Sequence, residues 1–560
     1  MSDDFFITLR YCDNVLAGNG PIYNPGEHTE GFTHFLWFVL LTAGRALGLG
    51  PILLGKYLEL PAFVGTLILL IRLSGRLFPE RGGLWRIPVA ALGWALHEDA
   101  QLYAFGGLET MFFCFLLLLG FWFACTSEHP RRVSLAAWAY GVSCLVRPEG
   151  LLFASIAGLY VLWRDGGRSA ARFALVCISL VGPLTVFRLL YYGYPFPNPY
   201  YAKSGGLAYW SQGWSYLSLY FGCYFVLLAS IPGVWVAARD FRSHSSRSAG
   251  PLLLAAASSA ASILYVTRLG GDYMFARFFL PITPWLLLLC ESLAQRPRHS
   301  AWRLALTGGL LGLILLGIVL KHVRLSADRP FHGITDEPTL HSFARLDRVR
   351  GIGQALQICF AGTQAKVLLA GGQASLAYYA QFPIAVESYG LTDASIAHSP
   401  IQHRGRPGHE KFADARYIDE HEVNFKIYYH PMRHLPQFVR VGFRGPGGSP
   451  IEGEILVYNR KLMDVLKTRP EVQFFDFPLW LQQIYLPTIG GRSTDRLIRE
   501  FNYFERFYFN HNADPEGLRL QLRAALAARG IREIPRLEIR ASEDSGHANW
   551  SPSAVITRVD

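Results

Sequence analysis

The chain has 560 residues, of which 51% are hydrophobic and only 17% are charged, and its mean hydropathy is +0.21. Such a balance excludes an ordinary soluble enzyme and predicts a polytopic membrane protein with a polar part attached. The net charge of +11 does not indicate a nucleic-acid partner, because the arginines lie in short loops between apolar segments rather than in a stripe on a soluble domain.

The first fifty residues carry an acidic pair, Asp3-Asp4, directly before apolar residues at helical spacing. Ionisable residues at a membrane boundary are costly and therefore suggest a function. One partner cannot cheaply neutralise two adjacent carboxylates, so one of them can stay ionised as a general base while the other orients it or the substrate. Asp3 would share a helix face with Arg10. Glu27 follows in a predicted Asn-Pro-Gly turn, where the evidence for chemistry is weaker.

Ten apolar segments are candidates for membrane-spanning helices. The apolar stretch 33–49 does not fit the loop charges as an eleventh span, and we expect an interfacial or re-entrant helix there. After residue 322 the chain has mixed charge, turn signals and no run long enough to span a bilayer. We therefore predict a first loop region at 1–50, a transmembrane domain at 51–322 and a soluble mixed α/β domain at 323–560. The ten candidate spans are 52–71, 87–104, 108–125, 133–146, 151–163, 173–192, 215–238, 251–267, 278–294 and 304–320.

Every second loop between these spans is basic, so by the positive-inside rule these loops are cytoplasmic. The remaining loops, the acidic pair and the C-terminal domain would then face outward. Because this leaves Met1 outside with no preceding span, we expect a missing first helix upstream of it. The arginines of the five basic loops are Arg72, Arg76, Arg81 and Arg86, Arg131 and Arg132, Arg164, Arg168 and Arg172, Arg239, Arg242 and Arg247, and Arg296, Arg298 and Arg303.

The predicted outer loops concentrate the polar residues that could bind a substrate. In the stretch 198–203, Asn198, Tyr201 and Lys203 could bind a sugar or a phosphate next to Arg188, although an aromatic interface belt explains the tyrosines as well. A Gly-Gly pair delivers Asp272 and, five residues later, Arg277 to the same rim. Carboxylates beside cations suit a reaction in which a hydroxyl is deprotonated and a phosphate leaves, but they also suit structural ion pairs. The candidate substrate- and phosphate-binding residues are Arg10, Glu27, Arg188, Asn198, Tyr201, Lys203, Asp272 and Arg277.

In the C-terminal part, residues 366–372 predict a buried strand that leads into a glycine turn. No HExxH, GxSxG or Walker pattern occurs in the chain, and the cysteines have no zinc spacing. We therefore assign no metal ligands. Paired carboxylates such as Asp3-Asp4 can bind a divalent cation, so the question of a cofactor stays open. His409 is expected to be a hydrogen-bonding loop residue.

Taken in order, these motifs resemble the polytopic GT-C glycosyltransferases, and within them the mycobacterial terminal arabinofuranosyltransferase and its bacterial relatives. The matching pieces are DDFFITLRYCDNVLAGNGPIYNPGEHTEGFTHFLW, GGLET, RPEG, RLLYYGYPFPNPYYAK, GGDYMFARFFLPI, ESYGLTD and GHEK. The first, fourth and fifth are specific in combination, whereas GGLET and RPEG alone are weak. After about residue 412 we find no matching motif.

The resemblance implies a GT-C-like fold in a bacterial cytoplasmic membrane, with the active site on the outer face. It implies a polyprenyl-phosphate sugar donor, a glycan or glycolipid acceptor of the cell envelope, and membrane lipids as surroundings. It also implies an inverting mechanism with a catalytic aspartate in the first outer loop, which corresponds here to Asp3-Asp4. Arg188, Lys203 and Arg277 would stabilise the leaving phosphate.

Two other functions remain alternatives. A lipid-linked glycan flippase or another transporter would also have many helices, although its charges would tend to lie near the middle of the membrane. An oligosaccharide ligase would differ from a single-sugar transferase only in the size of its donor.

Overall fold

The computed structural model describes residues 2–79, 88–126, 129, 131–203, 207–243, 248–297, 299–325, 330–336, 342–369, 373–401, 404–428 and 435–535. Four of the predicted basic-loop residues, Arg81, Arg86, Arg247 and Arg298, lie outside the described residues, as do Ala370 to Gly372 of the predicted glycine turn.

The chain forms two compact units that exchange short segments. The first unit comprises Met1–Pro21, Glu30–Ser342 and His403–Glu410, and the second comprises Ile22–Thr29, Phe343–Gln402 and Lys411–Asp560. A segment of the N-terminal loop therefore belongs to the second unit, and a short loop from the C-terminal half belongs to the first. The predicted three-part division at 1–50, 51–322 and 323–560 stays a prediction.

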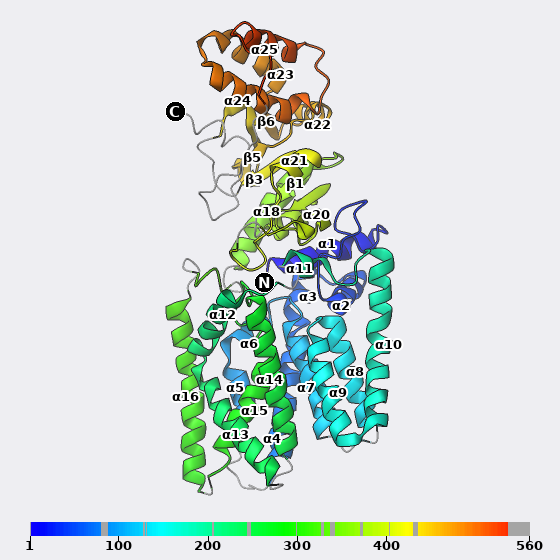
Figure 1. The fold of residues 1–560 in the computed structure, drawn as a ribbon, viewed down its shortest axis with the longest axis vertical. Coiled ribbons are helices and arrows are strands. Elements are labelled where there is room, and N and C mark those ends of the chain that lie inside the picture. Colours follow the sequence, from blue (N-terminus) through cyan, green and yellow to red (C-terminus); the bar gives the residue numbers. More distant parts are fainter. Residues whose placement is uncertain are drawn as a thin grey trace. The chain divides into compact units, whose positions relative to one another are not determined.

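The first unit is helical. Leu, Val, Ile, Ala and Phe dominate these segments, so their long apolar faces can pack on one another or face lipid. The elements in chain order are α1 (Asp4–Leu16), α2 (Phe35–Ala46), α3 (Pro51–Tyr57), α4 (Leu60–Leu77), α5 (Val89–Leu96), α6 (Glu98–Tyr103), α7 (Thr110–Cys125), α8 (Arg132–Val146), α9 (Gly150–Asp165), α10 (Gly167–Tyr191), α11 (Asn198–Ala202), α12 (Trp210–Cys223), η2 (Phe225–Ala229), α13 (Ser230–Arg242), α14 (Ala249–Leu269), η3 (Leu280–Ile282), α15 (Thr283–Ala294) and α16 (Ser300–Arg324) (Figure 1).

Within the described residues, four helical segments are long and apolar enough to cross a membrane: Pro51–Leu77, Gly167–Tyr191, Ala249–Leu269 and Ala301–Arg324. A fifth span would be the pair Trp210–Cys223 and Phe225–Arg242, which is bent by 92° at the break. Shorter apolar helices such as α7, α8 and α15 pack beside them. The predicted multi-pass helical membrane protein is confirmed.

Three predicted spans are interrupted. The segment 52–71 divides at residues 58–59 into α3 and α4. The segment 87–104 divides at His97 into α5 and α6, and the segment 215–238 divides after α12, where η2 leads into α13. The predicted interfacial segment 33–49 contains α2, whose 12 residues are fewer than the roughly 20 that a spanning helix needs.

The second unit is built on a six-stranded mixed sheet of order β2-β1-β3-β5-β4-β6. β1 (Lys366–Leu369) pairs in parallel with β2 (Ile384–Glu387) and β3 (Phe425–Tyr428), and Leu368 lies opposite both Val386 and Lys426. β4 (Arg440–Arg444), β5 (Pro450–Ile455) and β6 (Val472–Phe474) complete the sheet through antiparallel pairs. The predicted C-terminal mixed α/β fold is confirmed. Its helical elements are α18 (Phe343–Phe360), α19 (Ala374–Ala380), α20 (Ala394–His398), α21 (Ala415–Glu420), η4 (Gln437–Val439), η5 (Pro446–Gly448), α22 (Arg460–Lys467), α23 (Phe477–Trp480), η6 (Leu481–Tyr485), η7 (Leu486–Gly491), α24 (Thr494–Phe504), η8 (Glu505–Phe509) and α25 (Leu518–Ala527).

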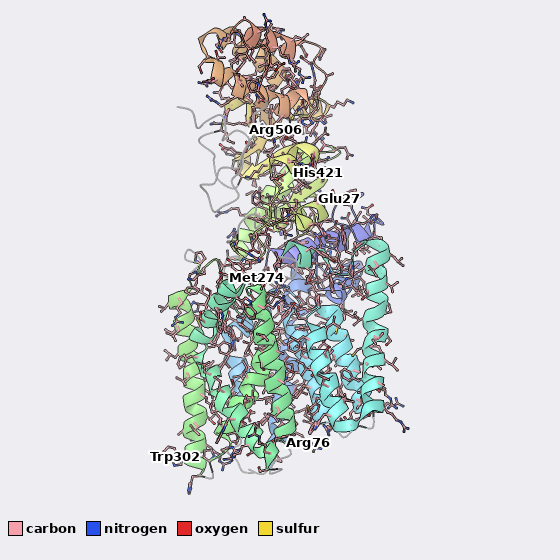
Figure 2. The ribbon with its side chains drawn as sticks, in the orientation of Figure 1. Glu27, Arg76, Met274, Trp302, His421 and Arg506 are labelled. Carbon is pink, nitrogen blue, oxygen red and sulfur yellow. The ribbon has the colours of Figure 1, made fainter. Side chains whose placement is uncertain are left out.

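Three labelled residues show which parts of the chain lie at each end of the helical unit. Figure 2 shows Arg76 near the end of α4 and Trp302 near the start of α16 at one end of the bundle, while Met274 lies at the other. The loop that contains Asp272 and Arg277 therefore lies at the end opposite Arg76, which belongs to a predicted cytoplasmic loop.

Candidate active site

Helix α1 presents Asp4 at its first position. The helix buries Phe5, Phe6 and Leu9 on its apolar face, which fixes its axis, while the side chain of Asp4 stays 24% exposed. The Asp4 carboxylate accepts a hydrogen bond of 3.2 Å from the hydroxyl of Tyr273. Asp3, which precedes the helix, is buried.

The loop after α14 brings its charged residues to Asp4 through a pair of glycines. Gly270 and Gly271 have φ values of +94° and +73°, which side chains rarely adopt. A Cβ atom on Gly271 would also lie 2.4 Å from Cγ of Tyr216, so only glycine lets the backbone pass here. The next residue, Asp272, accepts a hydrogen bond of 2.8 Å from the backbone N–H of Tyr273.

Arg277 connects three carboxylates. Its Nη1 lies 4.0 Å from Oδ2 of Asp4 and 3.7 Å from Oδ2 of Asp272, and its Nη2 lies 3.3 Å from Oε1 of Glu109. Lys203 adds a second cation, with Nζ 3.9 Å from Oδ1 of Asp272. Because Arg277, Asp272 and Glu109 are buried, solvent screens these interactions weakly.

A second group of buried polar side chains surrounds Glu109. Nδ1 of His34 lies 3.1 Å from Oε2 of Glu109, and Nε2 of His34 lies 2.8 Å from the hydroxyl of Thr8. The Thr8 hydroxyl donates to Nε2 of His34 or accepts from it, depending on the tautomer of the ring. Arg147 approaches the other side of Glu109 at 3.7 Å and pairs with Glu149 at 3.1 Å.

The environment of Asp4 disfavours its ionised form. Burial raises the pKa of Asp4 above the ordinary aspartate value, the cations Lys203 and Arg277 oppose this shift, and the carboxylates of Asp3 and Asp272 add to it. A carboxylate with a raised pKa accepts a proton more readily than an ordinary aspartate, as a general base requires.

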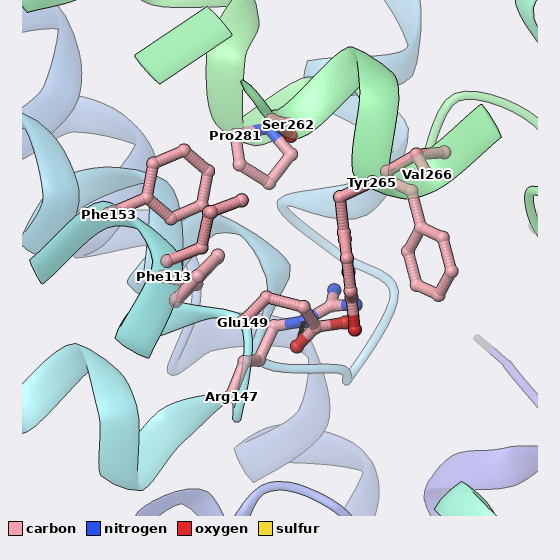
Figure 3. A pocket seen from close by; sticks show the side chains of 10 residues that line it. Phe113, Arg147, Glu149, Phe153, Ser262, Tyr265, Val266 and Pro281 are labelled. Carbon is pink, nitrogen blue, oxygen red and sulfur yellow. Dashed lines mark hydrogen bonds and ion pairs between the residues drawn. The ribbon is translucent and has the colours of Figure 1, made fainter. Parts of the chain in front are cut away.

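An apolar pocket lies beside this network. It is lined by residues of α7, α9, α14 and η3 and encloses about 290 Å³, which includes space open to solvent. At its polar end, the guanidinium of Arg147 lies 4.9 Å from the ring centroid of Phe278 and 5.6 Å from that of Phe113. Figure 3 shows Tyr265 directed toward Arg147 and Glu149. The pocket is thus linked to Arg277 through Arg147 and Glu109.

The other residues predicted for the site have different surroundings. Arg188 makes a bidentate pair with Glu30, with distances of 2.7 and 2.9 Å, and the backbone N–H of Asn198 donates to the carbonyl of Glu30. Tyr201 contacts the rings of Tyr194 and Tyr200.

Arg10 lies half-buried on α1. Glu27 belongs to the second unit, where it accepts a hydrogen bond of 3.0 Å from the Asn24 side chain. Of the predicted residues, Asp4, Lys203, Asp272 and Arg277 share one described network, and the role of each stays a prediction.

Sequence reasoning missed His34 and Tyr273 as parts of this network, and for Glu109 and Glu149 helix capping is the simplest explanation from sequence alone. Both glutamates do precede helices, α7 and α9, but neither side chain makes a capping hydrogen bond. Instead the carboxylate of Glu59 accepts hydrogen bonds from Met111 N and Phe112 N at the start of α7. The sequence feature that could have identified Glu109 as a site residue is its place in the GGLET motif.

Among the described residues, no group of three or more His, Cys, Asp or Glu side chains is arranged to hold a metal ion. Around Asp4 and Asp272, the positions near the carboxylates are taken by the cations Arg277 and Lys203.

No protein-family model matches the chain. Over 320 residues it is 33% identical to the terminal β-(1→2)-arabinofuranosyltransferase of Mycobacterium tuberculosis, which covers 50% of this chain and 50% of that protein. Over 321 residues it is 28% identical to the terminal β-(1→2)-arabinofuranosyltransferase of Corynebacterium glutamicum, which covers 50% of this chain and 46% of that protein. The predicted resemblance is confirmed, and the chain spans about half the length of the curated relatives it matches.

Two solved structures match part of the chain. A crystal structure of ArnT from Cupriavidus metallidurans bound to undecaprenyl phosphate matches with a TM-score of 0.49 and 15% identity, over 70% of this chain and 83% of that chain. The apo state of the same protein matches with a TM-score of 0.48 and 13% identity. That match covers 76% of this chain and 88% of that chain.

Proposed function

We propose that this chain is a GT-C-type membrane glycosyltransferase. It transfers arabinofuranose from a polyprenyl-phosphate donor to a cell-envelope glycan or glycolipid on the outer face of the cytoplasmic membrane. The similarity to the two arabinofuranosyltransferases supports the sugar. The observation that carries the proposal is the position of the Asp4 carboxylate next to Arg277, with Lys203 on the neighbouring Asp272.

In this proposal Asp4 is the general base. The acceptor hydroxyl loses its proton to Asp4 as its oxygen attacks the anomeric carbon from the face opposite the phosphate. The bond between the anomeric carbon and the phosphate oxygen breaks, and polyprenyl phosphate leaves with the bonding electron pair, so the configuration inverts. The raised pKa of Asp4 supports this role, because proton transfer is most effective when the pKa of the base approaches the working pH.

Arg277 and Lys203 are the cations proposed to stabilise the leaving phosphate. Both already lie next to Asp272, at 3.7 and 3.9 Å, so this carboxylate holds their side chains in place before the donor binds. A preorganised cation at the position where negative charge develops is worth more than one that must reorient. Arg188 is a weaker candidate in this respect, because its guanidinium is engaged by both oxygens of Glu30.

The apolar pocket gives the proposal a place for the lipid. Phe113, Phe153 and Val266 line it together with Arg147 at its polar end. The space enclosed in this structure is far smaller than a polyprenyl chain, so in this proposal the pocket must widen to admit the lipid. A lipid that enters there would direct its phosphate toward Arg147, which is one carboxylate, Glu109, away from Arg277.

The test is a transfer assay with the full chain in proteoliposomes, using a short polyprenyl-phosphoryl arabinofuranose and an arabinan oligosaccharide as acceptor. We expect transfer by the wild type and a loss of about 10²- to 10⁴-fold in Asp4→Asn, since that is the usual contribution of a general base. The matched control is Asp13→Asn on the same helix, where Asp13 pairs with Arg45 at 3.1 Å. Retained activity in Asp4→Asn would overturn the role of Asp4, and donor translocation without transfer would favour a flippase.

A further inference from the structure

The ring of Tyr273 is enclosed by a loop from the C-terminal half of the chain. The guanidinium of Arg406 lies 4.4 Å from the ring centroid, and the His409 ring lies 5.1 Å away at an interplanar angle of 86°. Lys203 approaches the same ring at 5.8 Å. Contacts of a cation with a ring face and of an aromatic edge with a ring are both attractive, and Tyr273 is only 8% exposed. The ring is therefore held in one place.

The backbone of Tyr273 is held by a second segment. Its carbonyl accepts a hydrogen bond of 2.7 Å from Thr335 N, and Phe275 N donates to the Thr335 carbonyl at 2.9 Å. Thr335 and the residues around Arg406 both follow α16 in the sequence. The loop 404–410 belongs to the first compact unit, although the segments on either side of it belong to the second.

The fixed ring places its hydroxyl on one oxygen of Asp4. Tyr273 donates to Oδ2, and Arg277 Nη1 is also nearest to Oδ2. Among the described residues, Oδ1 of Asp4 makes neither a hydrogen bond nor an ion pair within these distances. The two oxygens thus have different surroundings, and Oδ1 is left to receive a proton.

We propose that Tyr273 is a positioning residue that holds Oδ2 of Asp4 and turns Oδ1 toward the acceptor hydroxyl, and that Arg406 and His409 keep the Tyr273 ring in place. This inference rests on the proposed role of Asp4 as the general base. It gives the loop 404–410 a function in the reaction without direct contact with the reacting atoms.

The loss of this hydrogen bond can be detected through the pKa of Asp4, which also depends on the charges around it. The charged groups that face Asp4 are Lys203 and Arg277, which favour its ionised form, and Asp3 and Asp272, which disfavour it. The Tyr273 hydroxyl donates a hydrogen bond to Asp4, and in this proposal that bond favours the ionised carboxylate. Burial, followed by Arg406, lowers the pKa of His409 to about 3, so His409 stays neutral and does not titrate with Asp4 near neutral pH.

The first test compares the pH dependence of kcat/KM in the wild type and in Tyr273→Phe. This variant keeps the ring and its contacts and removes only the hydroxyl. We expect the acid limb, where Asp4 becomes protonated, to move to higher pH by about one unit or more, because hydrogen bonds to charged groups are strong. We also expect kcat to fall while KM for the donor changes little. An unchanged acid limb would overturn the proposal.

The second test addresses the loop. Arg406→Gln and His409→Ala release the ring but keep the hydroxyl, so we expect smaller shifts in the same direction, and His409→Phe should restore the wild-type profile. The matched control is Arg404→Gln in the same loop, because Arg404 contacts the Tyr209 ring at 4.8 Å and has no described contact with Tyr273. Equal effects of Arg404→Gln and Arg406→Gln would contradict a specific hold on Tyr273.

A substrate-free measurement separates this inference from the proposed function. Infrared difference titration of the carboxyl bands, with Asp4→Asn as the reference, reports the pKa of Asp4 directly. A higher Asp4 pKa in Tyr273→Phe supports the positioning role, and an equal pKa rejects it, whether or not transfer is observed. Absence of transfer by the wild type with the stated donor and acceptor would count against the proposed function alone.

Discussion

Arg277 and Asp4 come from distant parts of the sequence, and Nη1 of Arg277 lies 4.0 Å from Oδ2 of Asp4. The same guanidinium lies 3.3 Å from Glu109, so a single cation joins the first helix, the start of α7 and the loop after α14. The position of Asp4 in this network depends on Arg277 in two ways, through its charge and through the geometry of the loops it connects.

Replacing Arg277 should therefore affect both activity and stability. In Arg277→Gln we expect the transfer rate to fall by about 10²- to 10³-fold, because a preorganised group that stabilises developing charge is lost. Since buried Glu109 and Asp272 would also lose a partner, we expect the free energy of unfolding to fall by about 3–5 kcal/mol. Transfer assays and thermal unfolding in proteoliposomes measure the two effects.

Arg277→Lys and Arg45→Gln are the informative comparisons. Arg277→Lys keeps the positive charge but replaces the planar guanidinium, which can bind several carboxylates at once, by a single ammonium group. We therefore expect a transfer rate between those of the wild type and Arg277→Gln. Arg45 pairs with the part-exposed Asp13 at 3.1 Å, and its loss should cost no more than about 1 kcal/mol. If Arg277→Gln were as active and as stable as Arg45→Gln, the contacts of Arg277 would contribute neither to the transfer rate nor to the free energy of unfolding.

Asp4 should reduce stability at neutral pH. Burial raises its pKa in the folded state above its unfolded value, so the stability it contributes is fully present below the unfolded pKa and is lost as the pH rises through the folded pKa. Asp4→Asn does not titrate. We therefore expect Asp4→Asn to have a higher Tm than the wild type at about pH 8, and this difference to shrink toward about pH 4. A Tm difference that is constant across this range would contradict the raised pKa.

Loop charge and motif order predicted a larger set of residues on one side, and Asp4, Lys203, Asp272 and Arg277 are the members of that set that share one network. Loop charge places residues on one side of the membrane, but it does not tell which loops on that side touch, and Arg188 and Glu27 have other partners. One C-terminal strand was also predicted, because β1 is itself a short apolar run that leads into a glycine turn.

The contacts of Tyr273 and Glu109 could not be predicted in this way. Hydrophobic periodicity reports one face of one helix, whereas Arg406 and His409 reach Tyr273 from a loop more than a hundred positions away. The helix breaks at His97 and Tyr224 were also missed. Tyr224 lies inside an apolar run and gives no signal, whereas the polar residues His97, Glu98 and Asp99 do interrupt the apolar run at the first break. The stacking of the His97 and Tyr224 rings at 4.0 Å is a tertiary contact that leaves no periodic signal.

Accessibility of single cysteines tests the predicted orientation. Asn19 lies exposed after α1, in the predicted outer region, and Arg168 lies exposed near the start of α10, in a predicted cytoplasmic loop. In intact cells, a membrane-impermeant thiol reagent should label Asn19→Cys but label Arg168→Cys only after permeabilisation. The reverse pattern would place Asp4 on the cytoplasmic side. The native cysteines give little background, since seven of the eight are buried.

Lys321 should be one of the least replaceable residues of the helical unit. Its fully buried amine lies 2.7 Å from Asp99, 3.0 Å from Asp336 and 3.5 Å from Glu98, so it compensates three carboxylates and joins the end of α16 to α6. In Lys321→Met these carboxylates lose their shared cation, and we expect the free energy of unfolding to fall by about 3–5 kcal/mol. Thermal unfolding of the purified protein provides the measurement.

The double variant Lys321→Met/Asp99→Asn separates charge from packing. Removing the charge of Asp99, which is fully buried and accepts a further hydrogen bond of 2.6 Å from Tyr224, should restore part of the lost stability. Arg239→Gln is the control at the surface, because Arg239 is 55% exposed in its pair with Asp240 and such pairs contribute at most about 1 kcal/mol. A Tm loss in Lys321→Met no larger than in Arg239→Gln would show that the buried cluster does not stabilise the bundle.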